Sequence, residues 1–291
     1  MTETALALAR KAGAHFRDRG FDNAQLEAER LLAAVLGMRR LDLYLQHDRP
    51  VSPEELDAFR AVVRRRLRRE PLQYILGETG FRRLVLRVDR RVLIPRPETE
   101  ILVGEVLAWA GQRTGVALDL GTGSGAIALS LAAEGGFERV VATDVSAGAL
   151  VVAAANAAAC GMAEKVDLRQ GAFYDAVAGM RFDAIASNPP YVAETDRALL
   201  PPEVAEWEPC EALFAGRDGM DALALIIAGA PAHLRPGGLL ALEVGVGQAA
   251  HVAERIHATG AFCPPRIVRD LAGQERVVLA ESKRETNQER T

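Results

Sequence analysis

From residue 116 onward, short apolar runs alternate with longer amphipathic or alanine-rich segments. The runs are rich in Val, Ile and Leu and read VALDLG (116–121), RVVATDV (139–145), KVDLRQG (165–171), FDAIASN (182–188) and GLLALEVG (238–245). Helical stretches such as SGAIALSLAAE (124–134) separate them. This alternation predicts an α/β fold, with a parallel sheet covered by helices on both faces and ligands at the carboxyl ends of the strands. Two further runs around LAGQ, within residues 264–281, predict an antiparallel hairpin that closes the sheet.

The first seventy or so residues carry helical patterns only. Within residues 21–38, four leucines fall on one side of a helix: Leu26, Leu31, Leu32 and Leu36. A second helix begins at SPEEL, where Ser52 is the N-cap and Glu55 completes a capping box. Its predicted buried stripe is Leu56, Phe59, Val63 and Leu67. The cations at its end, RRRLRRE (64–70), are expected to complement the helix dipole on a solvated face rather than to bind nucleic acid.

Residues 81–95, FRRLVLRVDRRVLIP, alternate apolar and charged side chains around a predicted turn at Asp89, as in a β-hairpin. The patterns therefore divide the chain into four parts. These are a helical N-terminal domain (1–75), a connecting hairpin (76–95), an α/β domain (96–280) and a polar tail expected to be disordered (281–291).

Composition narrows the class of protein. The 291 residues are 49% hydrophobic and 25% charged, which suits a large buried core. With a net charge of −4, the whole chain lacks the basic character of a general nucleic-acid binder. No long uncharged apolar stretch and no signal-peptide pattern is present, so we expect a soluble, cytoplasmic protein without a membrane partner. Three scattered cysteines form no CxxC pair, which argues against a disulfide framework and against a metal site.

The segment DLGTGSGAIALSLA (119–132) follows the first predicted strand of the sheet and opens a helix. Its glycines, in the run Gly121, Thr122, Gly123, Ser124 and Gly125, allow a ligand to approach the main chain closely. Asp144 ends the next strand, where a ribose-binding acid is expected. Together these features favour a site for an adenosine-containing cofactor over a loop that merely permits a tight turn.

Two features favour S-adenosylmethionine over NAD. Asp119 can receive the methionine ammonium or order the loop, whereas it would repel the diphosphate of a dinucleotide. The second feature is SNPPYV (187–192), which a dehydrogenase does not need. Phe173, at the end of the third strand, can lie against adenine or be an ordinary core residue.

The tip SNPPYV suits methyl transfer to a planar NH2 group. An amide nitrogen is a poor nucleophile because its lone pair is delocalised, so the enzyme must hold it in a reactive geometry. The side-chain carbonyl of Asn188 and the backbone carbonyl of Pro189 can accept its two N–H bonds, and Pro190 keeps the segment rigid. Tyr191 adds a flat face. Adenine N6, cytosine N4 and a glutamine side chain all remain possible substrates.

Several motifs, in this order, resemble the PrmC/HemK family of peptide chain release factor methyltransferases. They are PLQYILGETGF (71–81), RVLIPRPETE (91–100), DLGTGSGAIALSLA (119–132), SNPPYV (187–192), EPCEALFAGRDGMDAL (208–223), LRPGGLLALEVGVGQ (234–248) and GQERVV (273–278). The resemblance spans about residues 5–280. IPRPETE is especially specific, because nucleic-acid methyltransferases that share NPPY do not generally carry it.

This resemblance implies a Rossmann-like class I S-adenosylmethionine-dependent methyltransferase domain with a small helical, substrate-docking N-terminal domain. It implies methylation of the N5 nitrogen of the glutamine in the GGQ motif of class 1 release factors, with no direct nucleic-acid substrate. The implied cofactor residues are Asp119, Gly121–Gly125, Asp144, Phe173 and Asn188, and those facing the glutamine are Asn188–Tyr191. IPRPETE (94–100) would lie near the pocket, or its charged residues could form a cap and ion pairs at the following helix.

Two positions depart from the family pattern. Ala172 stands where an Asp usually precedes the stacking aromatic, so we expect weaker cofactor binding or a substitute acceptor for the adenine amino group. Cys210 stands where the family often has Arg or another polar residue. An amino-methyltransferase of DNA or RNA is the competing hypothesis, supported by NPPY and opposed by the acidic balance. A non-catalytic cofactor-binding module is the third.

Overall fold

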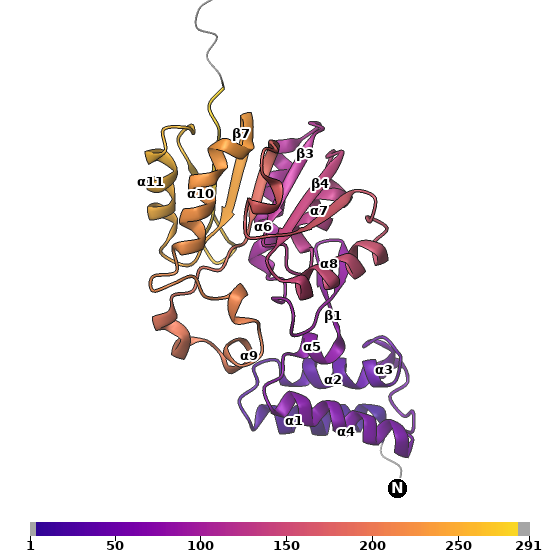
Figure 1. The fold of residues 1–291 in the computed structure, drawn as a ribbon. Coiled ribbons are helices and arrows are strands. Elements are labelled where there is room, and N and C mark those ends of the chain that lie inside the picture. The colour runs from indigo at the N-terminus through magenta and orange to yellow at the C-terminus, as the bar shows by residue number, and fades with distance from the viewer. Residues whose placement is uncertain (1–3, 285–291) are drawn as a thin grey trace, which may run out of the picture. The chain divides into compact units, whose positions relative to one another are not determined.

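The computed structural model describes residues 4–284 of the chain. They form two compact units. Unit 1 runs to Glu78 and also includes Pro201–Trp207; unit 2 holds Thr79–Leu200 and the chain from Glu208 onward. A short segment that follows SNPPYV in the sequence therefore belongs to the N-terminal unit. Figure 1 shows the two units as a helical part and a sheet-containing part.

Unit 1 is helical. Its elements are α1 (Ala5–Arg17), α2 (Ala24–Val35), α3 (Asp42–Leu45), α4 (Pro53–Leu67), α5 (Leu72–Leu76) and α9 (Pro202–Ala205). The predicted capping box is confirmed, since Ser52 Oγ accepts from the Glu55 amide at 3.2 Å and Glu55 Oε2 accepts from the Ser52 amide at 2.9 Å. Phe59 anchors α4 in a core with Phe16 and Leu32, while Leu56, Val63 and Leu67 are half-buried at its border.

The leucine stripe predicted for α2 is partly wrong. Leu26 is 37% exposed, whereas Glu29 on the same helix is buried. Glu29 tolerates burial because Tyr44 donates its hydroxyl to it and Arg40 pairs with it at 2.8 Å. In α2 the acid Glu29 is thus buried while Leu26 is exposed. Helical periodicity does not reveal this, because it assumes that apolar side chains are the buried ones.

The basic run at the end of α4 is only in part the solvated face that we predicted, because Arg64, Arg65 and Arg68 are exposed but Arg66 is buried. Arg66 is only 6% exposed; it pairs with Glu27 at 2.6 Å and with Glu203 at 3.2 Å. Its guanidinium also stacks 4.2 Å from the centroid of the Phe21 ring. These contacts tie α4 to α2 and to the segment Pro201–Trp207 within unit 1.

Unit 2 begins with a two-stranded hairpin, β1 (Glu78–Phe81) and β2 (Leu84–Arg87). Its turn lies at Arg82 and Arg83, so the turn predicted at Asp89 was misplaced. Arg82 adopts a left-handed conformation with φ of 50°, and Glu100 accepts its backbone amide at 3.0 Å. Asp89 opens a separate turn after the hairpin, where its backbone carbonyl accepts from the Val92 amide at 3.1 Å.

The main sheet has seven strands in the order β5-β4-β3-β6-β7-β9-β8. The strands are β3 (Val116–Leu120), β4 (Arg139–Asp144), β5 (Val166–Gln170), β6 (Phe182–Ser187), β7 (Leu234–Glu243), β8 (Arg266–Arg269) and β9 (Glu275–Glu281). Strands β3 to β7 pair in parallel, and β9 pairs antiparallel with β7 and β8. The predicted parallel sheet with a closing antiparallel hairpin is confirmed.

Helices cover both faces of this sheet, as can be followed in Figure 1. One core packs α6 (Pro97–Ala110), α7 (Ala126–Glu134) and α8 (Ala147–Ala159) against the strands, and the other packs α10 (Asp221–His233) and α11 (Ala249–Ala258). The strands between them bury residues on both faces, which explains their nearly continuous apolar sequences.

The end of the chain departs in part from the predicted tail. Glu281 completes β9 and Ser282 forms an isolated antiparallel bridge with Phe262. The rest of the predicted tail, residues 285–291, lies outside the described residues. No helix in residues 4–284 is long and apolar enough to cross a membrane.

Candidate active site

The register of the sheet brings three sequence-predicted segments to one edge. Leu120 of β3 pairs with Thr143 of β4 on one side and with Ser187 of β6 on the other. Because all three strands are parallel, the glycine loop, Asp144 and Asn188 leave them at the same carboxyl edge. This is the switch point at which a doubly wound sheet binds its ligand.

The glycine loop is held from beneath by Asp119. Gly121 and Gly123 have φ values of 72° and 55°, a conformation that strains any residue with a Cβ. Asp119 is fully buried, and its Oδ2 accepts from Thr122 Oγ1 at 2.6 Å and from the Ala128 amide at 3.1 Å. Of the two roles considered for Asp119, the structure shows loop ordering. Its Oδ1 is buried without a hydrogen-bond partner in the described chain, and burial raises its pKa to about 7.

Asp144 is also tied to this loop. Its Oδ2 accepts from the Gly123 amide at 2.9 Å and its Oδ1 from the Ser146 amide at 2.9 Å. Burial raises the pKa of Asp144, and the nearby Glu211 charge acts in the same direction. Each oxygen retains a lone pair, so the carboxylate can still accept from a ribose hydroxyl.

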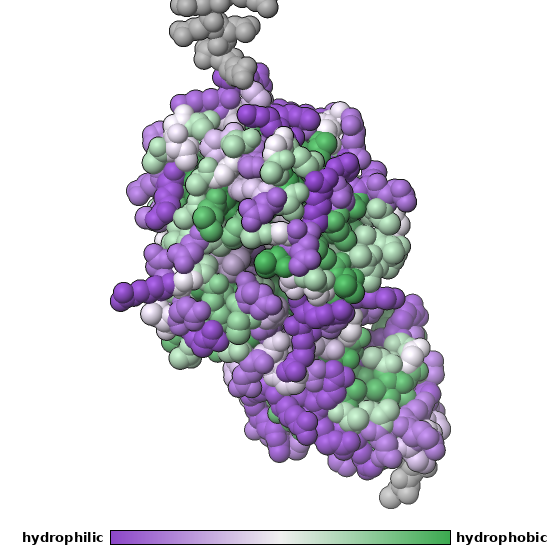
Figure 2. Space-filling view, viewed as in Figure 1, coloured by the Kyte–Doolittle hydropathy of each residue, from purple (hydrophilic) through white to green (hydrophobic). Residues whose placement is uncertain are grey.

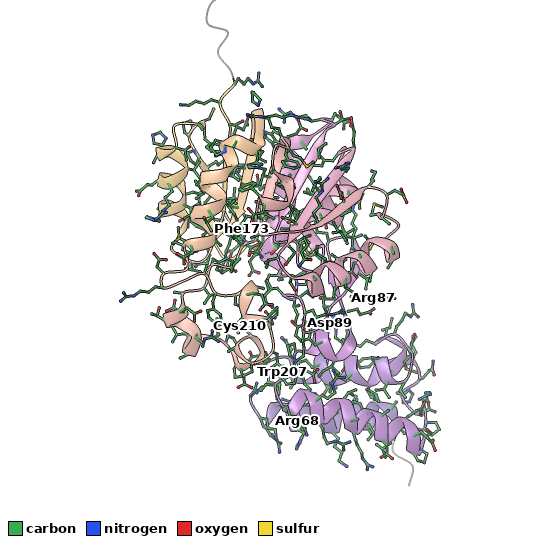
Figure 3. The ribbon with its side chains drawn as sticks, in the orientation of Figure 1. Arg68, Arg87, Asp89, Phe173, Trp207 and Cys210 are labelled. Atoms are coloured by element: carbon green, nitrogen blue, oxygen red, sulfur yellow. The ribbon has the colours of Figure 1, made fainter. Side chains whose placement is uncertain are left out.

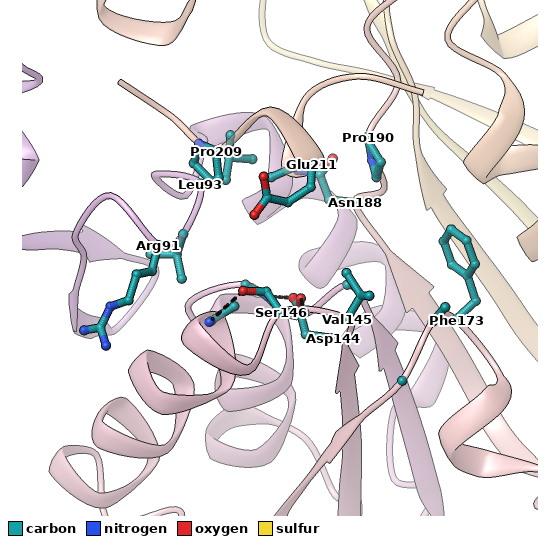
Figure 4. Close-up of a pocket in the computed structure, with 17 residues that line it drawn as sticks. Arg91, Leu93, Asp144, Val145, Ser146, Phe173, Asn188, Pro190, Pro209 and Glu211 are labelled. Atoms are coloured by element: carbon teal, nitrogen blue, oxygen red, sulfur yellow. Dashed lines mark hydrogen bonds between the residues drawn. The ribbon is translucent and has the colours of Figure 1, made fainter. Parts of the chain in front are cut away.

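A cavity of about 310 Å³ opens over these groups. In Figure 4, Phe173 stands at one end and Arg91 at the other, while Glu211 points in from the side opposite Asp144. The lining comprises Arg91, Val92, Leu93, Gly121, Gly123, Asp144, Val145, Ser146, Ala149, Gly171, Ala172, Phe173, Asn188, Pro190, Pro209, Glu211 and Ala212. Sequence reasoning missed Arg91 and Glu211, which come from loops outside the strand-end pattern.

Phe173 packs against one core of unit 2 and also reaches the cavity. It lines the cavity, half-buried, and its backbone is left-handed with φ of 45°, which is rare for a bulky side chain. Figure 3 shows it within unit 2, beside the strands. Thr143 Oγ1 donates to its carbonyl at 3.2 Å and so fixes the strained segment. Ala172 is exposed and lines the same cavity, so the departure from the family pattern falls on the cavity wall.

The tip that follows β6 presents one unpaired acceptor. Asn188 lines the cavity, and its Oδ1 is buried with no hydrogen-bond partner in the described chain. Its Nδ2 donates to Thr99 Oγ1 at 3.0 Å. Pro190 lines the cavity as well, Pro189 is buried, and the backbone carbonyl of Tyr191 accepts from Gln248 Nε2 at 3.0 Å. Hydrogen bonds with Thr99 and Gln248 therefore hold the tip at Asn188 and at Tyr191.

Behind Asn188 lies a buried acid that sequence reasoning did not single out. Glu243 is 1% exposed; its Oε2 accepts from Thr99 Oγ1 at 2.7 Å and its Oε1 from the Tyr191 hydroxyl at 3.4 Å. Burial raises the pKa of Glu243 to about 7. The sequence does mark this residue: Glu243 is the one acid inside the apolar run LLALEVG, and an acid in a buried strand is rare enough to suggest a function.

The motif IPRPETE (94–100) contributes the N-cap position and the first turn of α6 and one ion pair, while none of its residues lines the cavity. Arg96 is the N-cap residue of α6, and it pairs with the buried Glu208 at 2.6 Å. Glu100 in the first turn accepts from the Arg82 backbone, and Thr99 reaches Asn188. Cys210, just beyond Glu208, is exposed, with its sulfur 3.7 Å from Arg197 Nη1.

The remaining predicted cofactor residues lie behind the cavity wall. Thr122 and Ser124 are buried, and the Ser124 carbonyl accepts from Asn156 Nδ2 at 2.8 Å. Gly125 is the N-cap of α7. These residues shape the loop, whereas Gly121 and Gly123 line the cavity. In residues 4–284, no group of three His, Cys, Asp or Glu side chains is arranged to hold a metal ion.

The residues present fit S-adenosylmethionine better than a dinucleotide. Two carboxylates, Asp144 and Glu211, face the cavity, which suits a ligand that carries sulfonium and ammonium charges. They would oppose a diphosphate. The Phe173 ring lies in the cavity wall, where it can stack on adenine, and Asn188, which also lines the cavity, has a buried amide oxygen that still lacks a donor in the described chain.

Two family models match the chain. The PrmC N-terminal domain matches residues 7–77, and the methyltransferase small domain matches residues 98–200.

The chain is similar over most of its length to proteins described as release factor glutamine methyltransferases. A release factor glutamine methyltransferase of Geobacter sulfurreducens is 45% identical over 91% of this chain and 92% of its own length. One from Cereibacter sphaeroides is 44% identical over 90% of this chain and 92% of its own length.

Solved structures share the fold. A methyltransferase from Pyrococcus furiosus aligns with a TM-score of 0.51 and 20% identity, covering 69% of this chain and 89% of its own. A ribosomal protein L11 methylase from Lactobacillus delbrueckii subsp. bulgaricus gives 0.50 and 21%, covering 68% and 85%. The expected class I methyltransferase fold is therefore confirmed.

Proposed function

Because this chain belongs to the release factor glutamine methyltransferase family, we propose that it methylates the side-chain amide nitrogen of the GGQ glutamine in class 1 peptide chain release factors. The observation that carries this proposal is the Asn188 amide oxygen, buried at the cavity wall without a partner. A substrate amide can supply the missing donor. Release factors act on the ribosome, so the reaction belongs in the cytoplasm.

S-adenosylmethionine supplies an electrophilic methyl group, and Gly121, Gly123, Asp144 and Phe173 form the walls that would hold it. Asn188 Oδ1 and the Pro189 carbonyl accept the two N–H bonds of the glutamine amide, which directs the nitrogen lone pair toward the methyl carbon. The bound cofactor would supply the methyl group and leave as S-adenosylhomocysteine, and the amide nitrogen, held by these two carbonyl oxygens, would then give one proton to water. Both acceptors gain strength as positive charge grows on the nitrogen, so they favour the transition state over the ground state.

We infer that unit 1 docks the protein substrate. A groove of about 490 Å³ lies between α1 and α4, lined by apolar Leu8 and Val63 and by cationic Arg60 and Arg64. In Figure 2 the green on this unit gathers near the position of α3 in Figure 1, and the surface over α1 and α4 is mostly purple on this face. An apolar floor with a cationic border suits an acidic amphipathic helix of the release factor.

The function is tested with labelled S-adenosylmethionine and a purified class 1 release factor. Its variant with Gln→Ala in the GGQ motif and a DNA duplex are the controls. Label on the unaltered factor alone supports the proposal. Label on the DNA, or on both forms of the factor, overturns it.

The docking proposal has its own test. Reversing two border charges with Arg60→Glu and Arg64→Glu should raise the KM for the release factor about fivefold, while kcat at saturating factor stays the same. Arg255→Glu, a charge reversal on α11, is the matched control. If the KM of the double variant equals that of the unaltered enzyme, the groove does not dock the release factor.

A further inference from the structure

A chain of hydrogen bonds runs from the cavity wall into the core of unit 2. Asn188 Nδ2 donates to Thr99 Oγ1 at 3.0 Å, and Thr99 Oγ1 donates to Glu243 Oε2 at 2.7 Å. The Tyr191 hydroxyl donates to the other oxygen of Glu243 at 3.4 Å. The chain joins the start of α6, the tip after β6 and the end of β7.

The sheet register explains why these groups meet. Ser187 of β6 pairs with Leu242 of β7, so the next residues, Asn188 and Glu243, leave neighbouring parallel strands side by side. Thr99 lies in the first turn of α6, a helix packed over the same strands. The carboxylate is 1% exposed, so bulk water does not compete for its lone pairs.

The chemistry of these groups fixes which one donates and which one accepts in each hydrogen bond. An ionised carboxylate only accepts hydrogen bonds, so Thr99 must give its single proton to Glu243. Thr99 then has only lone pairs to offer Asn188, and it receives the NH2 end of that amide. The opposite end, Oδ1, is left without a partner in the described chain, on a residue that lines the cavity. A flipped amide would present NH2 to the substrate NH2, donor against donor.

We infer that Thr99 and Glu243 are positioning residues, which hold the Asn188 amide with its carbonyl oxygen toward the nitrogen that is methylated. This inference rests on the proposed function. Neither residue lines the cavity, and both act through Asn188. A purely structural role for Glu243 would instead lower stability and leave turnover per folded molecule unchanged.

Thr99→Val is the sharpest test, because it keeps the shape of the side chain and removes the hydroxyl. We expect kcat to fall about 10- to 100-fold, which is the loss of rate typical when a catalytic group is held in the wrong position. The Kd for S-adenosylhomocysteine, measured by calorimetry, should stay within about twofold, because the glycine loop is untouched. Thr99→Ser restores the hydroxyl and should recover most of the rate.

Ser130→Ala is the matched control. Ser130 is fully buried in α7, and its hydroxyl has no hydrogen-bond partner in the part of the chain that the structure describes. Its removal should leave kcat unchanged. A Thr99→Val enzyme with the full kcat, or a Thr99→Ser enzyme as slow as Thr99→Val, overturns the inference. Failure of the unaltered enzyme to label the release factor overturns the proposed function instead.

Glu243→Gln gives a second, independent readout. An amide both donates and accepts, so it no longer fixes the direction of the Thr99 proton, and kcat should again fall about tenfold or more.

The pH profile should change as well. Burial raises the pKa of Glu243 to about 7; the Glu98 charge acts in the same direction, while the hydrogen bond from Thr99, the Arg276 charge and the Tyr191 hydroxyl oppose the rise. Protonation below that pKa lets the carboxyl donate, so kcat of the unaltered enzyme should decline as pH falls through about 7. Asp119 titrates in the same range beneath the glycine loop, so kcat is measured at saturating cofactor. A decline that persists unchanged in Glu243→Gln contradicts the role of this carboxylate.

Discussion

Each of the two segments that form the active site rests on a buried carboxylate. Asp119 lies beneath the glycine loop and Glu243 beneath the tip after β6, and neither is more than 1% exposed. A threonine hydroxyl donates to each, Thr122 to Asp119 at 2.6 Å and Thr99 to Glu243 at 2.7 Å. Burial raises both pKa values to about 7.

The two carboxylates differ in what they hold. Asp119 accepts from a backbone amide, that of Ala128, and so fixes the main chain of the loop. Glu243 accepts only from side-chain hydroxyls, those of Thr99 and Tyr191, and so fixes the orientation of another side chain. Under the proposed function, the first acid therefore acts on the cofactor site, and the second acts on the geometry of the transfer step.

Removing the acceptor itself should give the largest effect. Asn188→Ala deletes the hydrogen bond that strengthens in the transition state, so kcat should fall by about 100-fold or more. The Kd for S-adenosylmethionine should stay nearly unchanged, since the glycine loop and Asp144 remain. Single-turnover methylation of the release factor, with calorimetry for the cofactor, separates the two quantities. Unchanged activity would rule out the mechanism.

Neutralising Asp119 should give a smaller effect, and one on cofactor affinity rather than on kcat. In Asp119→Asn, the amide oxygen can keep both hydrogen bonds that Oδ2 accepts, but the NH2 then takes the place of Oδ1, which is buried with no partner in the described chain. An unpaired buried group costs about 1–3 kcal/mol, so cofactor affinity should fall about tenfold, while kcat at saturating cofactor changes little. Glu243→Gln is the matched comparison and should show intact affinity with reduced kcat. If both variants show the same pattern, the contrast between the two carboxylates is wrong.

The same contrast explains what the sequence could predict. Asp119, Thr122 and Ala128 lie within one strand, loop and helix, so a local motif reveals the cofactor loop. Thr99, Asn188 and Glu243 come from three elements that only the sheet register brings together. Ion pairing also accounts for the burial of Glu29 and Arg66; helical periodicity gave no sign of the first, and the charge pattern had placed the second on a solvated face. The turn at Arg82 and Arg83 carries no glycine or proline to mark it.

The smallest predicted effect is confined to the cofactor half of the site. Ala172 is exposed at the cavity wall beside Phe173, where the family usually has an aspartate. Ala172→Asp would add an acceptor for the adenine amino group. One hydrogen bond contributes about 1 kcal/mol, so the Kd for S-adenosylmethionine should fall about fivefold.

Calorimetry with S-adenosylmethionine measures this gain, and Ala172→Asn controls for the added charge near Asp144 and Glu211. Because Ala172 does not contact the hydrogen bonds behind Asn188, kcat at saturating cofactor should not change. An unchanged Kd would mean that a main-chain carbonyl already accepts from the adenine. A changed kcat would mean that the two halves of the site are coupled, since a cofactor held more tightly at adenine would then also move the methyl group relative to Asn188.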